Sequence, residues 1–287
     1  MSRVHDALMR AGQMPDVETA AADAGSPRNG RGAAVGAPLA SILNLNGLLD
    51  NVQEIPFNPA PESHLIDLHR PMETPSEEFR SLRTKLNYIQ TLQPIHTVVI
   101  TSPSPAEGKS FTTMNLALAE SHLADNRVLC ADFDLRRPTL HNMLQVERAP
   151  GVSDFLMGKA TLDQIIRKIA GSNLYFMPAG TIVKNPLELL NLREAKALFD
   201  ELPQLFNWVL CDSPPVLFSA DSTLLSNYAD GTVLVVRTGA TTIDTITRAT
   251  QALSESNVLG VVANGARAGE LYSKYTYYYS KKEEPGA

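Results

Sequence analysis

The chain has 287 residues, of which 44% are hydrophobic and 20% charged, and its formal net charge is −6. This length suits one α/β domain with appended segments, and the hydrophobic share suffices for a sizeable core. The negative balance provides no global basic field, so we expect no nucleic-acid partner. No stretch approaches the roughly 18 consecutive apolar residues of a membrane span, and no signal-peptide core opens the chain, so the sequence predicts a cytoplasmic protein.

The chain divides by composition into four segments. Residues 1–14 are expected to form a short helix. Residues 15–62 are rich in Ala, Gly, Pro and Ser, which is typical of a flexible linker. A globular domain is expected over 63–268, followed by a tail over 269–287.

A helix is expected just before the first core strand, opened by Thr74-Pro75-Ser76. Within it, Glu77 and Arg80 are i, i+3 neighbours, and Arg83 follows one turn later. The spacing alone favours a solvated helix face with a weak intrahelical ion pair.

Apolar strands alternate with helical segments from Pro94 onward. Such alternation predicts an α/β fold, a mostly parallel sheet with helices on both faces. Strands are expected near 97–101, 127–132, 174–178, 208–212, 231–237 and 258–263, and helices near 109–124, 187–205, 219–227 and 242–256.

The first of these strands enters a loop that closes on Gly108, Lys109 and Ser110 and continues directly as a helix. This context suits a phosphate-binding loop, in which backbone N–H groups and the helix N-terminus cradle phosphates. Lys109 would reach the β- and γ-phosphates, and the Ser110 hydroxyl would hold Mg²⁺. The usual pattern has glycine where Pro103 stands. The residues expected to contact the nucleotide are Ser104, Pro105, Ala106, Glu107, Gly108, Lys109, Ser110 and Phe111.

Aspartates follow two further apolar strands, Asp132 and Asp134 after one and Asp212 after the other. Strand side chains alternate, so Asp132 and Asp134 are expected on the same side, where a cation would relieve their repulsion. Parallel strands deliver their carboxyl ends to one edge, where α/β folds bind ligands. A lone aspartate after a strand is usually a cap or turn former. The three together predict a Mg²⁺ site with Ser110, and with Lys109 they form the expected catalytic group.

Three segments resemble the Walker A, Walker A′ and Walker B motifs of the bacterial tyrosine kinases (BY-kinases). They are Ser102–Ser110, Asp132-x-Asp134-x-Arg136 and Asp212-x-Pro214-Pro215. The resemblance extends from about Pro75 to the C-terminus. It implies a P-loop NTPase fold and a protein-tyrosine kinase that uses ATP and Mg²⁺.

The resemblance also implies roles for individual residues. Lys109 would neutralise charge on the transferred phosphoryl group. Asp132 would act as the base for the tyrosine hydroxyl, with a share in metal binding. Arg136 would orient the aspartate pair, and Asn264 would contact the adenine, as the matching asparagine does in related P-loop ATPases.

The tail holds five of the eight tyrosines of the chain. Mobile termini are accessible, and BY-kinases autophosphorylate on such a cluster, so the resemblance implies acceptors that are phosphorylated between subunits. The alternative is an aromatic edge strand or an adhesive hydrophobic end. The acceptor candidates are Tyr272, Tyr275, Tyr277, Tyr278 and Tyr279.

The spacing Glu77-x-x-Arg80-x-x-Arg83 matches the oligomerisation motif of BY-kinases, which implies a homo-oligomeric ring. Family members act in the synthesis and export of exopolysaccharide or capsule. A transmembrane activator of the chain-length-determinant type regulates them. The resemblance therefore implies that a separate activator places this protein at the inner face of the plasma membrane.

Two other classes of function are compatible with parts of the sequence. A regulatory ATPase resembling the chromosome-partitioning and division-site ATPases would share the sheet and the acidic motifs. Those proteins carry a signature lysine five residues before the P-loop lysine, where this chain has Ser104. A non-catalytic nucleotide-sensing module would require an inert aspartate pair. Ser104 and the tyrosine tail favour the kinase.

Overall fold

The structure is a computed structural model that describes residues 45, 47–66 and 75–266. The helix expected over 1–14 and the tyrosines of 272–279 lie outside these described residues. None of the helices within the described part has the length and apolar run needed to cross a bilayer.

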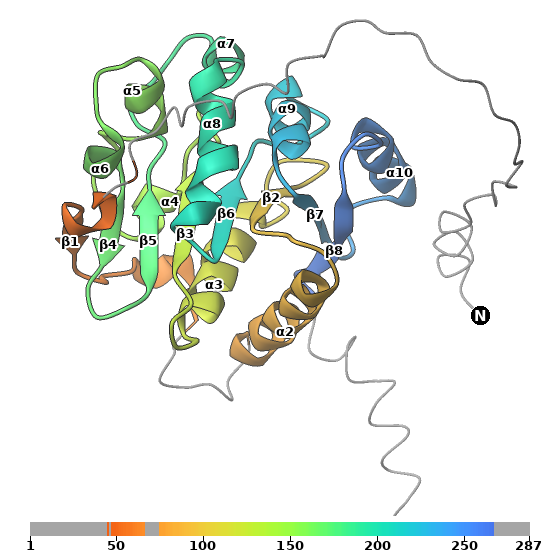
Figure 1. The fold of residues 1–287 in the computed structure, drawn as a ribbon. Coiled ribbons are helices and arrows are strands. Elements are labelled where there is room, and N and C mark those ends of the chain that lie inside the picture. Colours follow the sequence, from red (N-terminus) through yellow and green to blue (C-terminus); the bar gives the residue numbers. More distant parts are fainter. Residues whose placement is uncertain (1–44, 46, 67–74, 267–287) are drawn as a thin grey trace, which may run out of the picture. The chain divides into compact units, whose positions relative to one another are not determined.

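One eight-stranded sheet organises the described residues, in the order β1-β4-β5-β3-β6-β2-β7-β8 (Figure 1). All neighbouring strands are parallel except β4 and β5, which are antiparallel. This confirms the expected mostly parallel α/β sheet. The strands are β1 (Gln53–Ile55), β2 (Thr97–Thr101), β3 (Val128–Asp132), β4 (Arg167–Ile169), β5 (Leu174–Met177), β6 (Trp208–Asp212), β7 (Gly231–Arg237) and β8 (Val258–Asn264).

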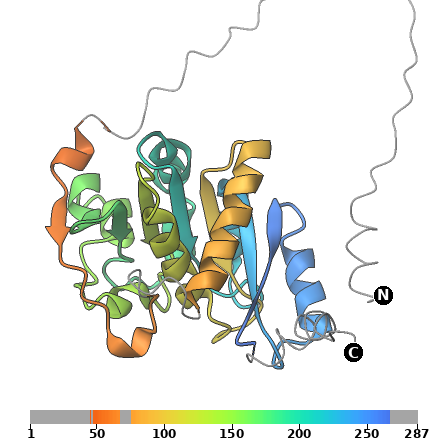
Figure 2. The same ribbon diagram turned by 90° about the horizontal axis from the view of Figure 1, so that it is seen from below.

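Helices cover both faces of this sheet (Figure 1, Figure 2). The α-helices are α2 (Ser76–Leu92), α3 (Lys109–Ser121), α4 (Leu140–Met143), α5 (Val152–Leu156), α6 (Leu162–Ile165), α7 (Pro186–Leu190), α8 (Arg193–Glu201), α9 (Ala220–Tyr228) and α10 (Ile243–Ala252). Short 3₁₀ turns are η1 (Leu48–Asp50), η2 (Pro61–Ser63) and η3 (Leu202–Gln204).

The central strands are apolar throughout because both of their faces are buried. In β2, Val98 and Ile100 face the core formed with α2, α3 and α4. Val99 faces the opposite core, formed with α5 to α9. The two layers hold β2, β3 and β6 rigidly, so the loops at their carboxyl ends have a fixed base.

The expected linker over 15–62 is wrong for its last part. Residues 47–62 include η1, β1 and most of η2, and β1 pairs with β4 in the sheet. Leu48 and Ile55 are buried, and the Ala170 N–H donates to the Ile55 carbonyl at 2.8 Å. Burial of these two apolar side chains stabilises a segment whose composition otherwise reads as a linker.

The single helix expected over 187–205 is divided into α7, α8 and η3. Leu192 has extended backbone angles (φ −66°, ψ 148°), which end the first helix before α8 begins. The backbone N–H and the side-chain amide of Asn191 both donate to the Leu187 carbonyl, at 3.0 and 2.8 Å, and so close the last turn of α7.

Candidate active site

The loop between β2 and α3 has the backbone of a phosphate-binding nest. Ala106 and Gly108 have positive φ angles (62° and 95°), and Gly108 is the N-cap of α3. Left-handed residues in such a loop turn successive N–H groups toward one concave side, where an anion binds. Pro103 is not among the positive-φ residues of the described chain. Glycine is therefore not needed at that position.

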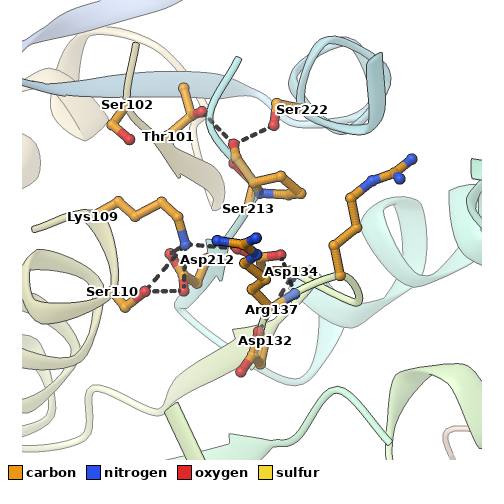
Figure 3. A network of polar contacts seen from close by, with 12 residues as sticks. Thr101, Ser102, Lys109, Ser110, Asp132, Asp134, Arg137, Asp212, Ser213 and Ser222 are labelled. Atoms are coloured by element: carbon orange, nitrogen blue, oxygen red, sulfur yellow. Dashed lines mark hydrogen bonds and ion pairs between the residues drawn. The ribbon is translucent and has the colours of Figure 1, made fainter. Parts of the chain in front are cut away.

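Four side chains converge where this loop meets the ends of β3 and β6 (Figure 3). The Lys109 Nζ lies 2.9 Å from Asp134 Oδ2 and 3.4 Å from Asp212 Oδ2. It also donates to the Ser110 Oγ at 3.2 Å. The Ser110 hydroxyl donates to Asp212 Oδ2 at 2.5 Å. The predicted convergence of these four residues is present in the structure.

Burial gives the cluster strong electrostatic coupling. Asp132, Asp134 and Asp212 are almost inaccessible to solvent. Burial and the neighbouring Asp134 raise the pKa of Asp212, against the opposing effects of Lys109 and the Ser110 hydrogen bond. Burial alone would lower the pKa of Lys109, but Asp212 and Asp134 outweigh it and the pKa is raised. One ammonium therefore faces more buried carboxylate than it can compensate.

The donor set fits Mg²⁺. Among the described residues, no group of three or more His, Cys, Asp or Glu side chains is arranged to hold a metal ion. The Ser110 hydroxyl with the Asp134 and Asp212 carboxylates nevertheless supplies oxygen atoms that surround the Lys109 ammonium. Mg²⁺ is usually bound by one or two carboxylates together with substrate phosphates and water, so these groups fit it.

Asp132 does not join this donor set, contrary to the expectation that it would share the metal. Its Oδ1 and Oδ2 accept the N–H groups of Asp134 and Leu140, both at 3.2 Å. The side chain points away from Ser110 and Lys109 (Figure 3). The strand ends at Asp132 and the chain then turns, so the alternation that placed Asp132 and Asp134 on one side no longer holds. Burial and then Asp212 raise the pKa of Asp132.

Arg136 is held by a partner that sequence reasoning missed. Its Nε and Nη2 donate to the two oxygens of Asp221, at 2.7 and 2.9 Å, and Nε also lies 3.0 Å from Ser219 Oγ. Asp221 is fully buried in α9. A bidentate pair of this kind fixes the guanidinium plane. Arg136 therefore joins the loop after β3 to α9, and its orientation of the aspartate pair stays a prediction.

A cavity of about 710 Å³ opens beside the cluster. Phosphate-binding residues form one part of its wall, and the Phe218 side chain, 68% exposed, lies at another. Of the expected nucleotide contacts, Ser104, Glu107 and Asn264 do not line it. The lining residues are Pro105, Ala106, Gly108, Lys109, Ser110, Phe111, Asp134, Arg136, Arg137, Thr139, Pro214, Pro215, Phe218 and Ser219.

Glu107 belongs to the phosphate-binding loop, and Asn264 contacts it from the end of β8. Glu107 is buried, its Oε2 has no hydrogen-bond partner, and burial raises its pKa. The Asn264 amide donates to the Glu107 backbone carbonyl at 2.9 Å. Arg237, which sequence reasoning missed, donates to the Ala106 carbonyl at 3.2 Å. A local motif could not signal it, because Arg237 lies 131 residues further along the chain.

The candidate oligomerisation residues lie on α2. Glu77 and Arg80 form an i, i+3 ion pair at 3.5 Å with both side chains substantially exposed. Arg83 instead donates to the Ala119 carbonyl near the end of α3 at 2.9 Å. Arg83 thus joins α2 to α3, whereas the ion pair of Glu77 and Arg80 lies within α2.

Fold and site define a P-loop nucleotide-binding protein, with the loop between β2 and α3 and acidic side chains at the ends of β3 and β6. No family model matches the sequence. The tyrosine-protein kinase YwqD of Bacillus subtilis is 34% identical over 222 residues, which cover 77% of this chain and 93% of YwqD. The chain belongs to the bacterial tyrosine kinase family.

Two further comparisons agree with membership of this family. The putative tyrosine-protein kinase EpsB of Ralstonia solanacearum is 33% identical over 237 residues, 78% of this chain. These residues are 32% of EpsB, so this chain spans about a third of that relative. The solved kinase domain of the Escherichia coli tyrosine kinase ETK superposes with a TM-score of 0.63 at 26% identity. That match covers 75% of this chain and 91% of the ETK domain.

Proposed function

We propose that this protein transfers the γ-phosphoryl group of ATP to tyrosine hydroxyls, with the tyrosines of its own tail among the acceptors. The observation that carries the proposal is the convergence of Lys109, Ser110, Asp134 and Asp212 at the end of the phosphate-binding loop. Phosphoryl transfer depends mainly on positioning and electrostatic stabilisation, and this cluster supplies both.

Each residue of the cluster has a role in the proposed reaction. Ser110, Asp212 and Asp134 would hold Mg²⁺, which neutralises phosphate charge when it is bound. Lys109 lies 2.9 Å from Asp134 and 3.4 Å from Asp212, and its ammonium would neutralise charge on the terminal phosphates. Pairing with these carboxylates keeps the Lys109 side chain charged within a buried site.

Asp132 is the proposed base for the tyrosine hydroxyl. A phenol has a pKa of about 10, so a nearby carboxylate assists its attack. In this structure the Asp132 carboxylate accepts two backbone N–H groups, those of Asp134 and Leu140. Catalytic hydrogen bonds often form only in the complex with substrates, so this geometry is compatible with the role.

The acceptor, the partners and the pathway are proposals that rest on family membership. Transfer to the cluster at 272–279 would occur between subunits of a homo-oligomeric ring built through Glu77 and Arg80. A transmembrane activator would hold the ring at the inner face of the plasma membrane. The process served would be the synthesis and export of exopolysaccharide or capsule.

Incubation with γ-labelled ATP tests the kinase against the regulatory ATPase. The kinase yields labelled phosphotyrosine, whereas an ATPase switch yields free phosphate alone. Lys109→Met should abolish labelling, because the terminal phosphates lose their buried cation. Lys184→Met removes an exposed lysine outside the cavity and is the control, with labelling expected to match the unaltered protein. Loss of labelling in both variants would contradict the role of Lys109.

A further inference from the structure

Two side chains from β7 and β8, at one end of the sheet order, contact the phosphate-binding loop. Arg237 ends β7 and Asn264 ends β8, and the two are paired directly in the sheet register. The Arg237 Nη1 donates to the Ala106 carbonyl at 3.2 Å. The Asn264 Nδ2 donates to the Glu107 carbonyl at 2.9 Å. Two successive carbonyls of the loop are therefore held by side chains from two adjacent strands.

Peptide geometry converts these contacts into an orientation of the loop N–H groups. A trans peptide is planar, and its carbonyl points opposite to the N–H of the next residue. A donor that holds the Ala106 carbonyl from behind therefore turns the Glu107 N–H toward the other side. The donor on the Glu107 carbonyl does the same for the Gly108 N–H. These are the amides that a phosphate-binding loop presents to its anion.

Close packing at Gly108 shows how tightly the two parts fit. A Cβ added to Gly108 would lie 1.8 Å from the Asn264 Nδ2, a distance that no side chain tolerates. The φ of 95° at Gly108 independently favours glycine. The loop can approach the Asn264 amide this closely only because Gly108 has no side chain.

Asn264 is itself fixed on both sides. Its Oδ1 accepts the Gly265 N–H at 2.9 Å. Its backbone carbonyl accepts the N–H and hydroxyl of Thr238 at 2.9 and 3.1 Å. The side-chain amide thus uses its oxygen for anchoring and its nitrogen for the loop, which an aspartate could not do.

We propose that Asn264 and Arg237 are positioning residues of the nucleotide site, which pre-orient the Glu107 and Gly108 amides for the phosphates. This role rests on the proposed nucleotide binding. It differs from the adenine contact that the sequence resemblance assigns to Asn264. A residue that acts through the loop affects every phosphate ligand, whereas an adenine contact affects only ligands that carry the base.

The test compares Asn264→Ala with Asn257→Ala. Asn257 lies just before β8 and also donates through Nδ2 to a backbone carbonyl, that of Asp230, at 2.8 Å. Asn264→Ala loses two side-chain hydrogen bonds, to Glu107 and Gly265, and Asn257→Ala loses one, so each variant is expected to lower the free energy of unfolding, the Asn264 variant somewhat more. The affinities of ADP and of inorganic pyrophosphate, both with Mg²⁺, are measured by displacement of a fluorescent ADP analogue.

Asn264→Ala should weaken both probes by roughly tenfold, because the two amides are no longer held for the phosphates. Asn257→Ala should leave both affinities unchanged. If Asn264→Ala weakens ADP but not pyrophosphate, Asn264 contacts the base and the proposal is wrong. If neither affinity changes, the hydrogen bond does not position the loop, and the proposal is equally wrong.

Arg237→Met carries the test if the Asn264 variant does not fold, because the Arg237 side chain lies at the surface. It too should weaken both probes. Arg248→Met, an exposed arginine of α10, controls for the lost charge and should change neither affinity. Equal weakening in both arginine variants would overturn the proposal. Failure of the unaltered protein to bind either probe would refute the proposed function itself, and the positioning role with it.

Discussion

Replacing Glu120 with glutamine should make the protein progressively more stable than the unaltered protein as the pH rises. Glu120 is a fully buried carboxyl at the end of α3. Its Oε2 accepts the side-chain amides of Asn87 on α2 and Asn126, at 3.2 and 3.1 Å. Its Oε1 has no hydrogen-bond partner. Burial raises the pKa of Glu120 to about 7, although Asn87, Arg83 and Asn126 oppose the shift.

The sign of the pH effect follows from linkage. The pKa of Glu120 is 4.5 in the unfolded chain and about 7 in the folded protein. Between these values the folded state binds more protons than the unfolded state, so the free energy of unfolding falls as pH rises. Each pKa unit corresponds to about 1.4 kcal/mol, so the full cost at pH 8 is about 3 kcal/mol.

Glutamine at this position cannot ionise, so the variant does not lose this free energy of unfolding as the pH rises. It retains an oxygen for the two asparagine amides, and any penalty of its buried NH₂ group is independent of pH. The stability difference between Glu120→Gln and the unaltered protein should therefore grow by about 2 to 3 kcal/mol between pH 5 and pH 8.

Urea unfolding followed by tryptophan fluorescence measures this difference, because the single tryptophan, Trp208, hydrogen-bonds Asn87 in the same network. Titration of the aspartates cancels because it is common to both proteins. Glu78→Gln, which removes an exposed carboxyl on α2, is the control for the loss of one carboxyl at the surface. A constant difference for Glu120→Gln would refute the reasoning that burial controls this carboxyl.

Three further predictions concern catalysis and assembly. Asp132→Asn should bind ADP as the unaltered protein does yet slow tyrosine phosphorylation by about a hundredfold or more in a quenched-flow assay, and an unchanged rate would remove Asp132 from the base role. Joint replacement of the exposed Glu77 and Arg80 by alanine should shift the particle toward monomer in light scattering, whereas a particle of unaltered mass would return this pair to a solvated helix face. A Lys109→Met protein mixed with active enzyme lacking residues 271–287 should become phosphorylated within 272–279, and absence of phosphotyrosine there by mass spectrometry would contradict transfer between subunits.

The central strands could be predicted because their physical signal is local. β2, β3 and β6 are continuous apolar runs buried on both faces, and the observed bounds differ from the expected ones by at most a residue. β1 and β4 have only three residues each, and two of the three in β4 are charged. Arg167 is buried there because its guanidinium donates to the Glu147, Ala149 and Pro150 carbonyls. Only the tertiary structure supplies those acceptors.

The site likewise contains residues that sequence motifs predict and contacts that only the tertiary structure shows. Motif spacing predicts that Lys109, Ser110 and Asp212 meet, because parallel strands end at one edge of the sheet. The pairing of Arg136 with Asp221 joins residues 85 positions apart, and no pattern in the sequence announces it. Arg237 and Asn264, which contact the phosphate-binding loop, are also remote from it in the sequence. They lie 131 and 157 residues beyond Ala106 and Glu107, respectively. Sequence identifies the residues that face the ligand more readily than those that hold them.

The stoichiometry of a chemically quenched reaction with γ-labelled ATP tests the central claim most directly. If Lys109, Ser110, Asp134 and Asp212 form a tyrosine kinase site, each ADP formed early in the reaction should be matched by one phosphotyrosine on the protein. The Lys109→Met protein should form neither product. ADP that accumulates together with free phosphate, and without labelled phosphotyrosine on the protein, would contradict the account.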